Sequence, residues 1–537
     1  MINKRTGQRR TTPYAKGYSD AGASLMRKAL KGFIPNSGSP GEDIDENNQT
    51  MRQRARMLYM ASPVATSAIN TNRTKVVGTG LVLKSVINRN VLGLSPEAAK
   101  VWQRQTEAEF ALWAEKKDNC DATGVNNFDG LQQLALKSWL MSGDVLSLFK
   151  RYDTTQLNPY SLRIHLIEAD RVATPTGPSI RTLPYTPSIT QAKAENGNTI
   201  YDGVEVDSSG RIVAYHIRNT YPYQLTVDPT EWARVQVYGE KTGLPNVLHI
   251  MDSERPDQYR GVSYLAQVIE PLLQLRRYTE SELMAALVQS FFTAWIRTKT
   301  DPSGIPMNET GAGDVVGVPS DQPDNVSESE NEYEMGPGTV NVLAENEDVT
   351  FGNPNVPTSG FEAFVKTICR LVGAALEMPY DVLAKEYNSS YSAARAALLE
   401  AWEAFRMRRK WFVDDFCQPV YEVWLTEAVA RGRIKAPGFF DDPRVRAAWC
   451  GARWIGPVQG QLDPVKEVKA AQAMVQSGFK THVQITREMG GGDWNENVEQ
   501  LQIENQMLAD AKGSDVSDLP SDPDDKDDEE GKQGANE

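Results

Sequence analysis

The longest helical pattern in this chain runs from Tyr387 to Gly432 and begins with a polar stretch, 387–390. A helix of about 40 residues would span roughly 60 Å. Pro419 lies inside the pattern and predicts a kink, because proline lacks a backbone N–H and crowds the preceding turn. Apolar residues recur through the stretch at helical spacing: Leu398, Trp402, Phe405, Phe412, Phe416, Val420, Trp424 and Val429.

Before residue 261 the pattern changes from helical to strand-like. Helical spacing comes first, over 51–78, 96–117 and 128–141. From Val145 to Ile250, short apolar or alternating runs separated by turn residues predict strands. The sequence Asp207-Ser208-Ser209-Gly210 is typical of a hairpin turn. The first half therefore predicts an α/β domain with a mixed or antiparallel sheet.

After residue 261 the patterns follow the order helix, acidic insertion, helix, loop and long helix. The insertion contains no Lys or Arg from Asp301 to Val365. The expected pieces are a helix over 262–297 kinked at Pro271, β-like pieces at 314–318 and 338–343, a helix over 361–378, and C-terminal helices at about 463–477 and 482–508.

Charge is distributed unevenly over a chain of net charge −14. The first thirty-one residues are basic, whereas the last two dozen are acidic and nearly without apolar groups, so the tail is expected to be disordered. The sequence has no apolar run of about 18 residues and no apolar signal-peptide core at its N-terminus, so we expect neither a membrane span nor secretion.

Motifs of catalysis and cofactor binding are missing from the sequence. It contains no G-x-x-x-x-G-K-[ST] and no G-x-S-x-G, and its four histidines are far apart. Carboxylate pairs are frequent, but a solvated acidic loop explains them better than a two-metal nuclease site. We therefore expect no enzyme, no cofactor and no metal. A metal-dependent nuclease is the enzyme alternative, which a magnesium-dependent cleavage assay would test.

Several sequence blocks together resemble the portal proteins of tailed bacteriophages, of the lambda type. No single block is highly specific, but their joint order is. The blocks are RQRARMLYMASPVATSAINTNRTKVVGTGL (52–81), LKSWLMSGDVL (136–146), HLIEADRV (165–172), GVEVDSSGRIVAYHI (203–217), VLHIMDSERPDQYRGVSYLAQVIEPLLQL (247–275), SYSAARAALLEAWEAFRMRRKWF (390–412) and ARWIGPVQGQLDPVKEVKAA (452–471).

The resemblance implies an α+β portal fold with an α/β wing, a two-helix stem, a small β-containing clip, a long wing helix and a helical crown. In chain order we expect a flexible basic N-terminal arm at 1–42, the wing at 43–261, stem helix 1 at 262–298, the clip at 299–359, stem helix 2 at 360–378, a channel loop at 379–390, the long wing helix and wing return at 391–459, the crown at 460–510 and a disordered acidic tail at 511–537.

The resemblance also implies a function and partners. Portal proteins form a dodecameric ring at one capsid vertex of the virion, and this ring would assemble in the host cytoplasm. Double-stranded DNA passes through it without sequence specificity during packaging, retention and ejection. The other implied partners are the terminase large subunit, then head-completion or connector proteins, and the major capsid protein or scaffold.

Three groups of residues are candidates for contacts in such a ring. Each Lys or Arg that neutralises a phosphate adds affinity, and a ring repeats each contact, so few basic groups should touch DNA. For the channel loop the candidates are Lys385, Tyr387, Asn388, Ser389 and Ser390. For docking of the terminase or connector on the clip they are Asp321, Asp324, Glu328, Glu330, Glu332 and Glu334. For intersubunit or structural pairing they are Arg406, Arg408, Arg409 and Lys410.

Two of these interpretations have an alternative. Lys385 could simply face solvent or a neighbouring subunit, and the acidic run could be a solvated surface. At the level of the whole protein, the alternative is another structural minor head or scaffold-associated capsid protein without a DNA channel. Electron microscopy would separate the two, because only a portal forms a ring with a central channel.

Overall fold

The structure is a computed structural model in which the chain divides into two compact units. Unit 1 comprises residues 1–269 and 373–537, and unit 2 comprises residues 270–372. The structure describes Lys28 and residues 37–175, 190–222, 231–290, 294–298, 347–351, 360–387, 390–460, 464–490 and 492–513. Most of the expected N-terminal arm, most of the clip with both of its β-like pieces, and nearly all of the acidic tail lie outside these residues.

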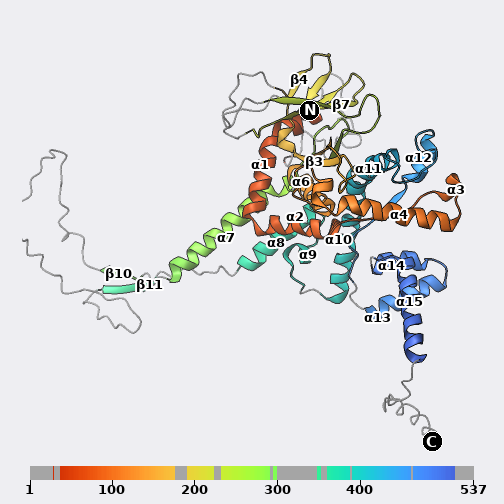
Figure 1. The fold of residues 1–537 in the computed structure, drawn as a ribbon. Helices are drawn as coiled ribbons and strands as arrows, with labels where there is room; N and C mark the ends of the chain where they lie inside the picture. Colours follow the sequence, from red (N-terminus) through yellow and green to blue (C-terminus); the bar gives the residue numbers. More distant parts are fainter. Residues whose placement is uncertain are drawn as a thin grey trace, which may run out of the picture. The chain divides into compact units, whose positions relative to one another are not determined.

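Unit 1 begins with helices that pack against one another (Figure 1). A π-helical turn, η3 (Gly41–Asp45), leads into α1 (Glu46–Ala61), which contacts α2 (Pro63–Val76) and α6 (Phe128–Ser142). The helical stretch 51–78 is therefore two helices, because Ser62 is extended before Pro63 (φ −113°, ψ 116°). The remaining helices of this region are α3 (Arg89–Leu92), α4 (Pro96–Ala114) and α5 (Lys117–Cys120).

Two antiparallel sheets follow the helices, as the strand patterns predict. The first has the order β3-β2-β9 and consists of β2 (Asp144–Arg151), β3 (Leu162–Glu168) and β9 (Val247–Met251). The second has the order β4-β5-β6-β7-β8 and consists of β4 (Gln191–Lys193), β5 (Thr199–Tyr201), β6 (Val204–Val206), β7 (Ile212–Arg218) and β8 (Trp232–Gln236). Buried side chains of both sheets, such as Leu146, Ile167, Val204 and Tyr215, share one apolar cluster.

The predicted hairpin turn joins β6 to β7. The Asp207 carboxylate accepts hydrogen bonds from the backbone N–H groups of Ser209 (2.8 Å) and Arg211 (3.0 Å). Gly210 has φ 86°, a left-handed conformation that glycine adopts without strain. The turn sequence thus closes the hairpin by the Asx chemistry that its residues predict.

The predicted long helix is interrupted one turn before the expected kink. It consists of α10 (Tyr391–Phe412), a π-helical segment η7 (Val413–Cys417) and α11 (Gln418–Ala430). The Gln418 N–H donates to the carbonyl of Val413, five residues back, so the chain enters Pro419 from a widened turn. Proline then occupies the first turn of α11, where its missing N–H is tolerated.

An aromatic core joins this long helix to the N-terminal helices. The Phe110 ring of α4 packs edge-on against Trp424 of α11 (5.0 Å) and Phe128 of α6 (5.6 Å). Trp113 and Trp424 are fully buried, and the Trp113 indole N–H donates to the Leu162 carbonyl (3.0 Å). The chain returns through α12 (Pro443–Trp449) to β12 (Ala452–Ile455), which pairs antiparallel with β1 (Val82–Ser85).

The described residues of unit 2 form two helices and one strand pair. The helices are α7 (Ile269–Ser290) and α8 (Phe361–Ala375), and β10 (Ala294–Thr298) pairs antiparallel with β11 (Glu347–Phe351). The helix predicted over 262–297 is therefore too long at both ends. The predicted kink at Pro271 is also wrong, because Pro271 lies in the first turn of α7, where backbone N–H groups have no intrahelical acceptor.

The C-terminal part of unit 1 is helical and thinly packed. It consists of α13 (Pro464–Gln476), α14 (His482–Met489) and α15 (Trp494–Gly513), so the helical pattern at 482–508 is two helices. Among the described side chains of these three helices, only Ala471 is buried. A capping box at Thr481 and Gln484 begins α14. Local helix signals rather than a core therefore define these elements.

Candidate functional site

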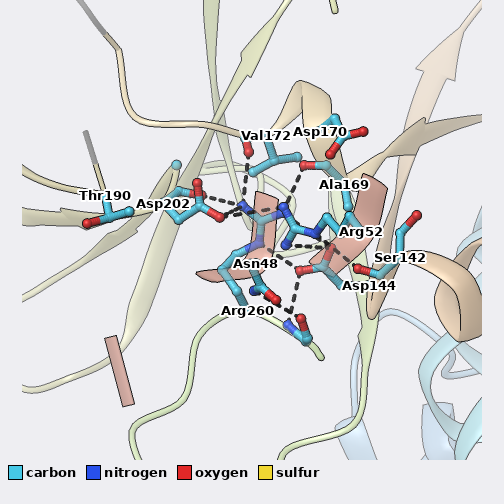
Figure 2. Close-up of polar contacts among 12 residues, drawn as sticks. Asn48, Arg52, Ser142, Asp144, Ala169, Asp170, Val172, Thr190, Asp202 and Arg260 are labelled. Carbon is cyan, nitrogen blue, oxygen red and sulfur yellow. Dashed lines mark hydrogen bonds and ion pairs between the residues drawn. The ribbon is translucent and has the colours of Figure 1, made fainter. Parts of the chain in front are cut away.

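Arg260 lies at the centre of a buried polar cluster, shortly before the chain passes into unit 2 (Figure 2). Its guanidinium is fully buried and donates to the Asp144 carboxylate (2.7 Å) and the Asp202 carboxylate (2.7 Å). It also donates to the backbone carbonyls of Val172 (2.9 Å) and Ala169 (2.8 Å). A buried guanidinium is stable only when its charge and its donors are matched in this way.

Helix α1 contributes a second arginine to the same cluster (Figure 2). Arg52 donates to the Ser142 carbonyl (3.0 Å) and lies 3.6 Å from both Asp144 and Asp202. One turn earlier, the Asn48 amide donates to the Gly261 carbonyl (3.1 Å). The cluster therefore ties α1, the start of β2, the β5–β6 turn and the segment at Arg260 together.

The arginines of this cluster offset the burial of its carboxylates to different degrees. Burial alone would raise the pKa of Asp144, but Arg260 and Arg52 hold it well below its usual range. Burial raises the pKa of Asp202, against the pull of the same two arginines. Burial, together with the nearby Asp202, raises the pKa of Asp45 to about 7. Asp144 is thus the fixed anion of the cluster, and Asp45 holds its proton up to neutral pH.

Two glycines allow the backbones at the cluster to touch. Gly143 has φ 89°, and a Cβ atom added to Gly261 would lie 1.9 Å from the Gly143 carbonyl oxygen. The Gly261 N–H donates to the Asp144 carboxylate (3.1 Å). Any larger residue at Gly261 would push the segment away from β2 and from its anchor.

Most residues of this cluster lie in the blocks that resemble portal proteins, but the sequence predicts no role for the cluster. Arg52, Asp144 and Arg260 come from three different blocks. Asp144 and Arg260 are charged and flanked by apolar or small residues, which is a weak signal for a buried ion pair, whereas Arg52 has the polar Gln53 beside it. The pairing itself joins residues more than 100 positions apart, so spacing could not reveal it.

Another buried arginine, Arg408 of α10, fixes the two places where unit 1 continues into and out of unit 2. The Tyr264 hydroxyl donates to the Leu376 carbonyl, which joins these two segments directly. Arg408 lies over the Tyr264 ring (4.8 Å) and donates to Glu377 (2.6 Å) and Asn72 (3.2 Å). The long helix therefore holds both segments in place from one buried side chain.

The other basic residues of the predicted pairing cluster differ in their surroundings. Arg409 donates to the carbonyls of Val76 (2.8 Å), Lys75 (2.7 Å) and Pro457 (2.8 Å), and so caps the C-terminus of α2. Burial, with help from Arg406, lowers the pKa of Arg409 to about 10. Lys410 pairs with Asp414 one turn along the helix (2.6 Å), and Arg406 is exposed.

The expected channel loop, 379–390, contains a short helix, α9 (Tyr380–Ala384). Its buried Leu383 accepts a hydrogen bond at its carbonyl from the Ser67 hydroxyl of α2 (2.7 Å). Lys385 ends α9 in a left-handed conformation (φ 56°) and is exposed, as is Tyr387. Ser390 caps α10, whereas Asn388 and Ser389 lie outside the described residues. The prediction of a loop over the whole of 379–390 is therefore wrong, because the apolar side chains of Val382 and Leu383 are buried and hold α9 in place.

The structure does not place the remaining candidate residues. The six acidic residues proposed for clip docking lie outside the described residues. Within the described ranges, no group of three or more His, Cys, Asp or Glu is arranged to hold a metal ion. In that same part of the chain, no helix is long and apolar enough to cross a membrane.

The chain is similar to known proteins over most of its length. The family model "Phage portal protein, lambda family" matches residues 27–409. The chain is 23% identical to the portal protein of Escherichia phage N15 over 485 residues, which are 87% of this chain and 86% of that protein. It is also 23% identical to portal protein B of Escherichia phage lambda, over 87% of this chain and 85% of that protein.

Solved structures give a further match. The chain resembles a protein in the neck of a native gene transfer agent particle computed with C12 symmetry, at 13% identity and a TM-score of 0.38. That match covers 83% of this chain and 94% of the other. The family match includes Arg260 and Arg408 with their partners and ends within α10, and it extends over more than half of the sequence. The chain belongs to the lambda family of phage portal proteins.

Proposed function

We propose that copies of this chain form a closed ring at one capsid vertex of a virion, and that double-stranded DNA passes through its channel without sequence specificity. The observation that carries the proposal is the family match over residues 27–409. The ring would have twelve subunits, serve packaging, retention and ejection of the genome, and act without catalysis. Its assembly would take place in the host cytoplasm.

The parts of the fold are assigned roles on the same basis. Residues 43–261 and 391–459 would form the wing, and helices α7 and α8 the stem pair with the clip between them. Residues 379–390, including α9, would be the channel segment, and α13–α15 the crown. The division into two units is compatible with this assignment, because unit 2 runs from one stem helix to the other.

Electrostatics support a channel that confines DNA with little friction. Arg408 and Arg409 are engaged within their own chain, so neither is available to a phosphate. The chain is acidic overall, and affinity for DNA rises with each phosphate that is neutralised. Lys385 is exposed within the proposed channel segment and is the proposed DNA contact.

Lys385→Ala tests that contact in a packaging reaction. The expected result is altered packaging or weaker retention of packaged DNA, while Lys410→Ala, which removes an exposed lysine already paired with Asp414, should change neither. Unchanged packaging and retention in Lys385→Ala would remove the proposed role.

The partners of the ring are those that the portal family implies, and the acidic clip is their proposed docking site. We assign Asp321, Asp324, Glu328, Glu330, Glu332 and Glu334 to docking of the terminase large subunit and later of a head-completion or connector protein. The major capsid protein or scaffold would surround the wing. Acidic residues would attract a basic partner surface, so binding should weaken with salt. Terminase binding that is insensitive to salt would count against this assignment.

Electron microscopy of the purified full-length protein tests the proposed function. A closed ring with a central channel wide enough for a DNA duplex is the expected result. Monomers, or open assemblies without a channel, would instead favour another minor head or scaffold-associated capsid protein.

A further inference from the structure

Four basic side chains lie close together on unit 1 and form a basic patch. Lys84 of β1 and Arg453 of β12 are directly opposite each other in the strand pair, so both side chains lie on the same face of it. Lys100 and Arg104 are one turn apart on α4, which packs against β1. The patch therefore joins a strand pair and a helix that are neighbours in the fold.

A carboxylate within the patch offsets only part of this charge. Glu107 of α4 lies 3.4 Å from the Lys84 ammonium and accepts a hydrogen bond from the Ser85 N–H (2.8 Å). Burial raises the pKa of Glu107, which disfavours its charged form. Like charges directly opposite each other in a strand pair, as Lys84 and Arg453 are, repel. Further anions facing the patch are therefore favourable.

Helix α15 supplies such anions. Glu496 pairs with Lys84. Glu499, three residues further along the same helix, pairs with Arg104 and lies 3.7 Å from the Lys100 ammonium. Its hydrogen bond with Arg104 lowers the pKa of Glu499 from its ordinary value. Two carboxylates of α15 thus contact three of the four basic residues of the patch.

Charge rather than apolar packing holds α15 against the patch. Among the described side chains of α15 none is buried, and residues 501–509 are all exposed. Exposed ion pairs contribute little to stability, because water competes for both partners and salt screens them. The chain keeps α15 near the patch at a high effective concentration, which strengthens these weak contacts. A polyanion of higher charge density would nevertheless displace the helix.

The phosphate backbone of DNA is a polyanion of this kind. Duplex DNA carries one negative charge per about 1.7 Å of helix axis, and each phosphate that a Lys or Arg neutralises adds affinity by releasing counterions. Helix α15 places two carboxylates at the patch, whereas a duplex would bring a continuous row of phosphates. The patch therefore suits the DNA backbone better than it suits its own helix.

We propose that the basic patch of Lys84, Lys100, Arg104 and Arg453 binds the phosphate backbone of double-stranded DNA, and that α15 covers this patch until DNA displaces the helix. While α15 is in place, its carboxylates neutralise most of the patch and keep the affinity of the chain for DNA low. Displacement of α15 would give unit 1 a hold on DNA that does not depend on base sequence. Patch and helix belong to one chain, so the proposal holds or fails independently of ring formation.

Binding of a short fluorescent duplex of random sequence to the full-length protein at low salt tests the proposal. The double variant Glu496→Gln, Glu499→Gln should bind at least about tenfold more tightly than the natural protein, because α15 then no longer neutralises the patch. Adding Lys100→Gln and Arg104→Gln to this variant should remove the gain. Unchanged affinity in the double variant, or a gain that survives the loss of both basic residues, would overturn the proposal.

A charge-matched variant and a second polyanion sharpen this measurement. Glu400→Gln, Glu504→Gln removes two exposed carboxylates elsewhere and should bind DNA like the natural protein. An equal gain in this variant would mean that net charge alone sets the affinity. Unlabelled duplex should compete for the uncovered patch at least about tenfold better than poly-glutamate of equal total charge. Equal competition would assign the patch to an acidic protein instead of DNA.

Carbodiimide coupling shows whether DNA displaces α15, because this reagent joins an amine to a carboxylate only where the two are in contact. The natural full-length protein should give a cross-link between Lys84 and Glu496 by mass spectrometry, and saturating duplex should reduce its yield several-fold. The cross-link between Lys480 and Glu488, which form another exposed ion pair, should not change. A Lys84–Glu496 yield that stays constant while DNA is bound would show that DNA binds elsewhere, and would contradict the proposal.

Discussion

Two sets of ion pairs in unit 1 use the same chemical groups in opposite surroundings. Arg260 and Asp144 are fully buried and saturated with hydrogen bonds. Arg104 and Glu499, which join α4 to α15, are about half exposed (54% and 44%). Water competes with an exposed pair, whereas a buried charge that loses its partner has no substitute. The first set therefore fixes the fold at the passage into unit 2, and the second holds the C-terminal helices only weakly.

Arg260→Met should have the largest effect, because it leaves Asp144 and Asp202 buried without their main cation. We expect a loss of about 3–5 kcal/mol in the free energy of unfolding, measured by urea denaturation. Arg255→Met is the matched control, since its guanidinium is partly exposed and pairs with an exposed carboxylate. Equal losses of unfolding free energy in the two variants would show that the buried cluster contributes no more to stability than an exposed ion pair.

Arg408→Ala should have an intermediate effect, because it removes charged hydrogen bonds to Glu377 and Asn72 and the contact with the Tyr264 ring. The expected loss is about 2 kcal/mol in the same urea measurement. Arg406→Ala, two residues away and exposed, should stay within about 0.5 kcal/mol of the natural protein. A larger loss in Arg406→Ala would reverse the assignment of roles within α10.

Asp45→Asn should stabilise the protein in a pH-dependent way. The pKa of Asp45 is raised from 3.8 to about 7 by burial and by Asp202, so ionisation of this carboxyl opposes folding. The folded state keeps a proton that the unfolded state releases, so Asp45 lowers stability as pH rises from about 4 to about 7. The variant should gain on the order of 2 kcal/mol at pH 8 and almost nothing at pH 4.

The free energy of unfolding of the natural protein and of Asp45→Asn, measured at pH 4 and at pH 8, gives this difference. The side chain of Asp45 makes no capping hydrogen bond to α1, so the amide does not remove a helix cap. A gain of the same size at pH 4 and pH 8 would contradict a raised pKa for Asp45.

Glu499→Gln should have the smallest effect on global unfolding. Arg104 would lose an exposed partner, which water replaces, so the melting temperature of the protein should not change measurably. Proteolysis within α15 should nevertheless become faster, and high salt should speed it in the natural protein in the same way. A clear drop in melting temperature would mean that these helices contribute to the core.

The sequence predicted local features of the fold better than its long-range contacts. The Asp207 turn depends on neighbouring residues, and the structure contains it. The kink expected at Pro419 is not confirmed, because a π-helical segment precedes the proline, which lies in the first turn of α11. Helix α9 was missed because its docking depends on the Ser67 hydroxyl, more than 300 residues away. Arg408 and Arg260 could not be placed from spacing, because their partners come from separate parts of the chain.

The central claim is that buried arginines fix both passages between the two units while the C-terminal helices remain loosely held. Hydrogen–deuterium exchange on the full-length protein tests it most directly. The amides of Gly261, Tyr264 and Met378, which are bonded to Asp144, Leu140 and Gly373, should exchange nearly as slowly as strand β2. Those of α13–α15 should exchange much faster. Equally fast exchange in the two regions would contradict the claim.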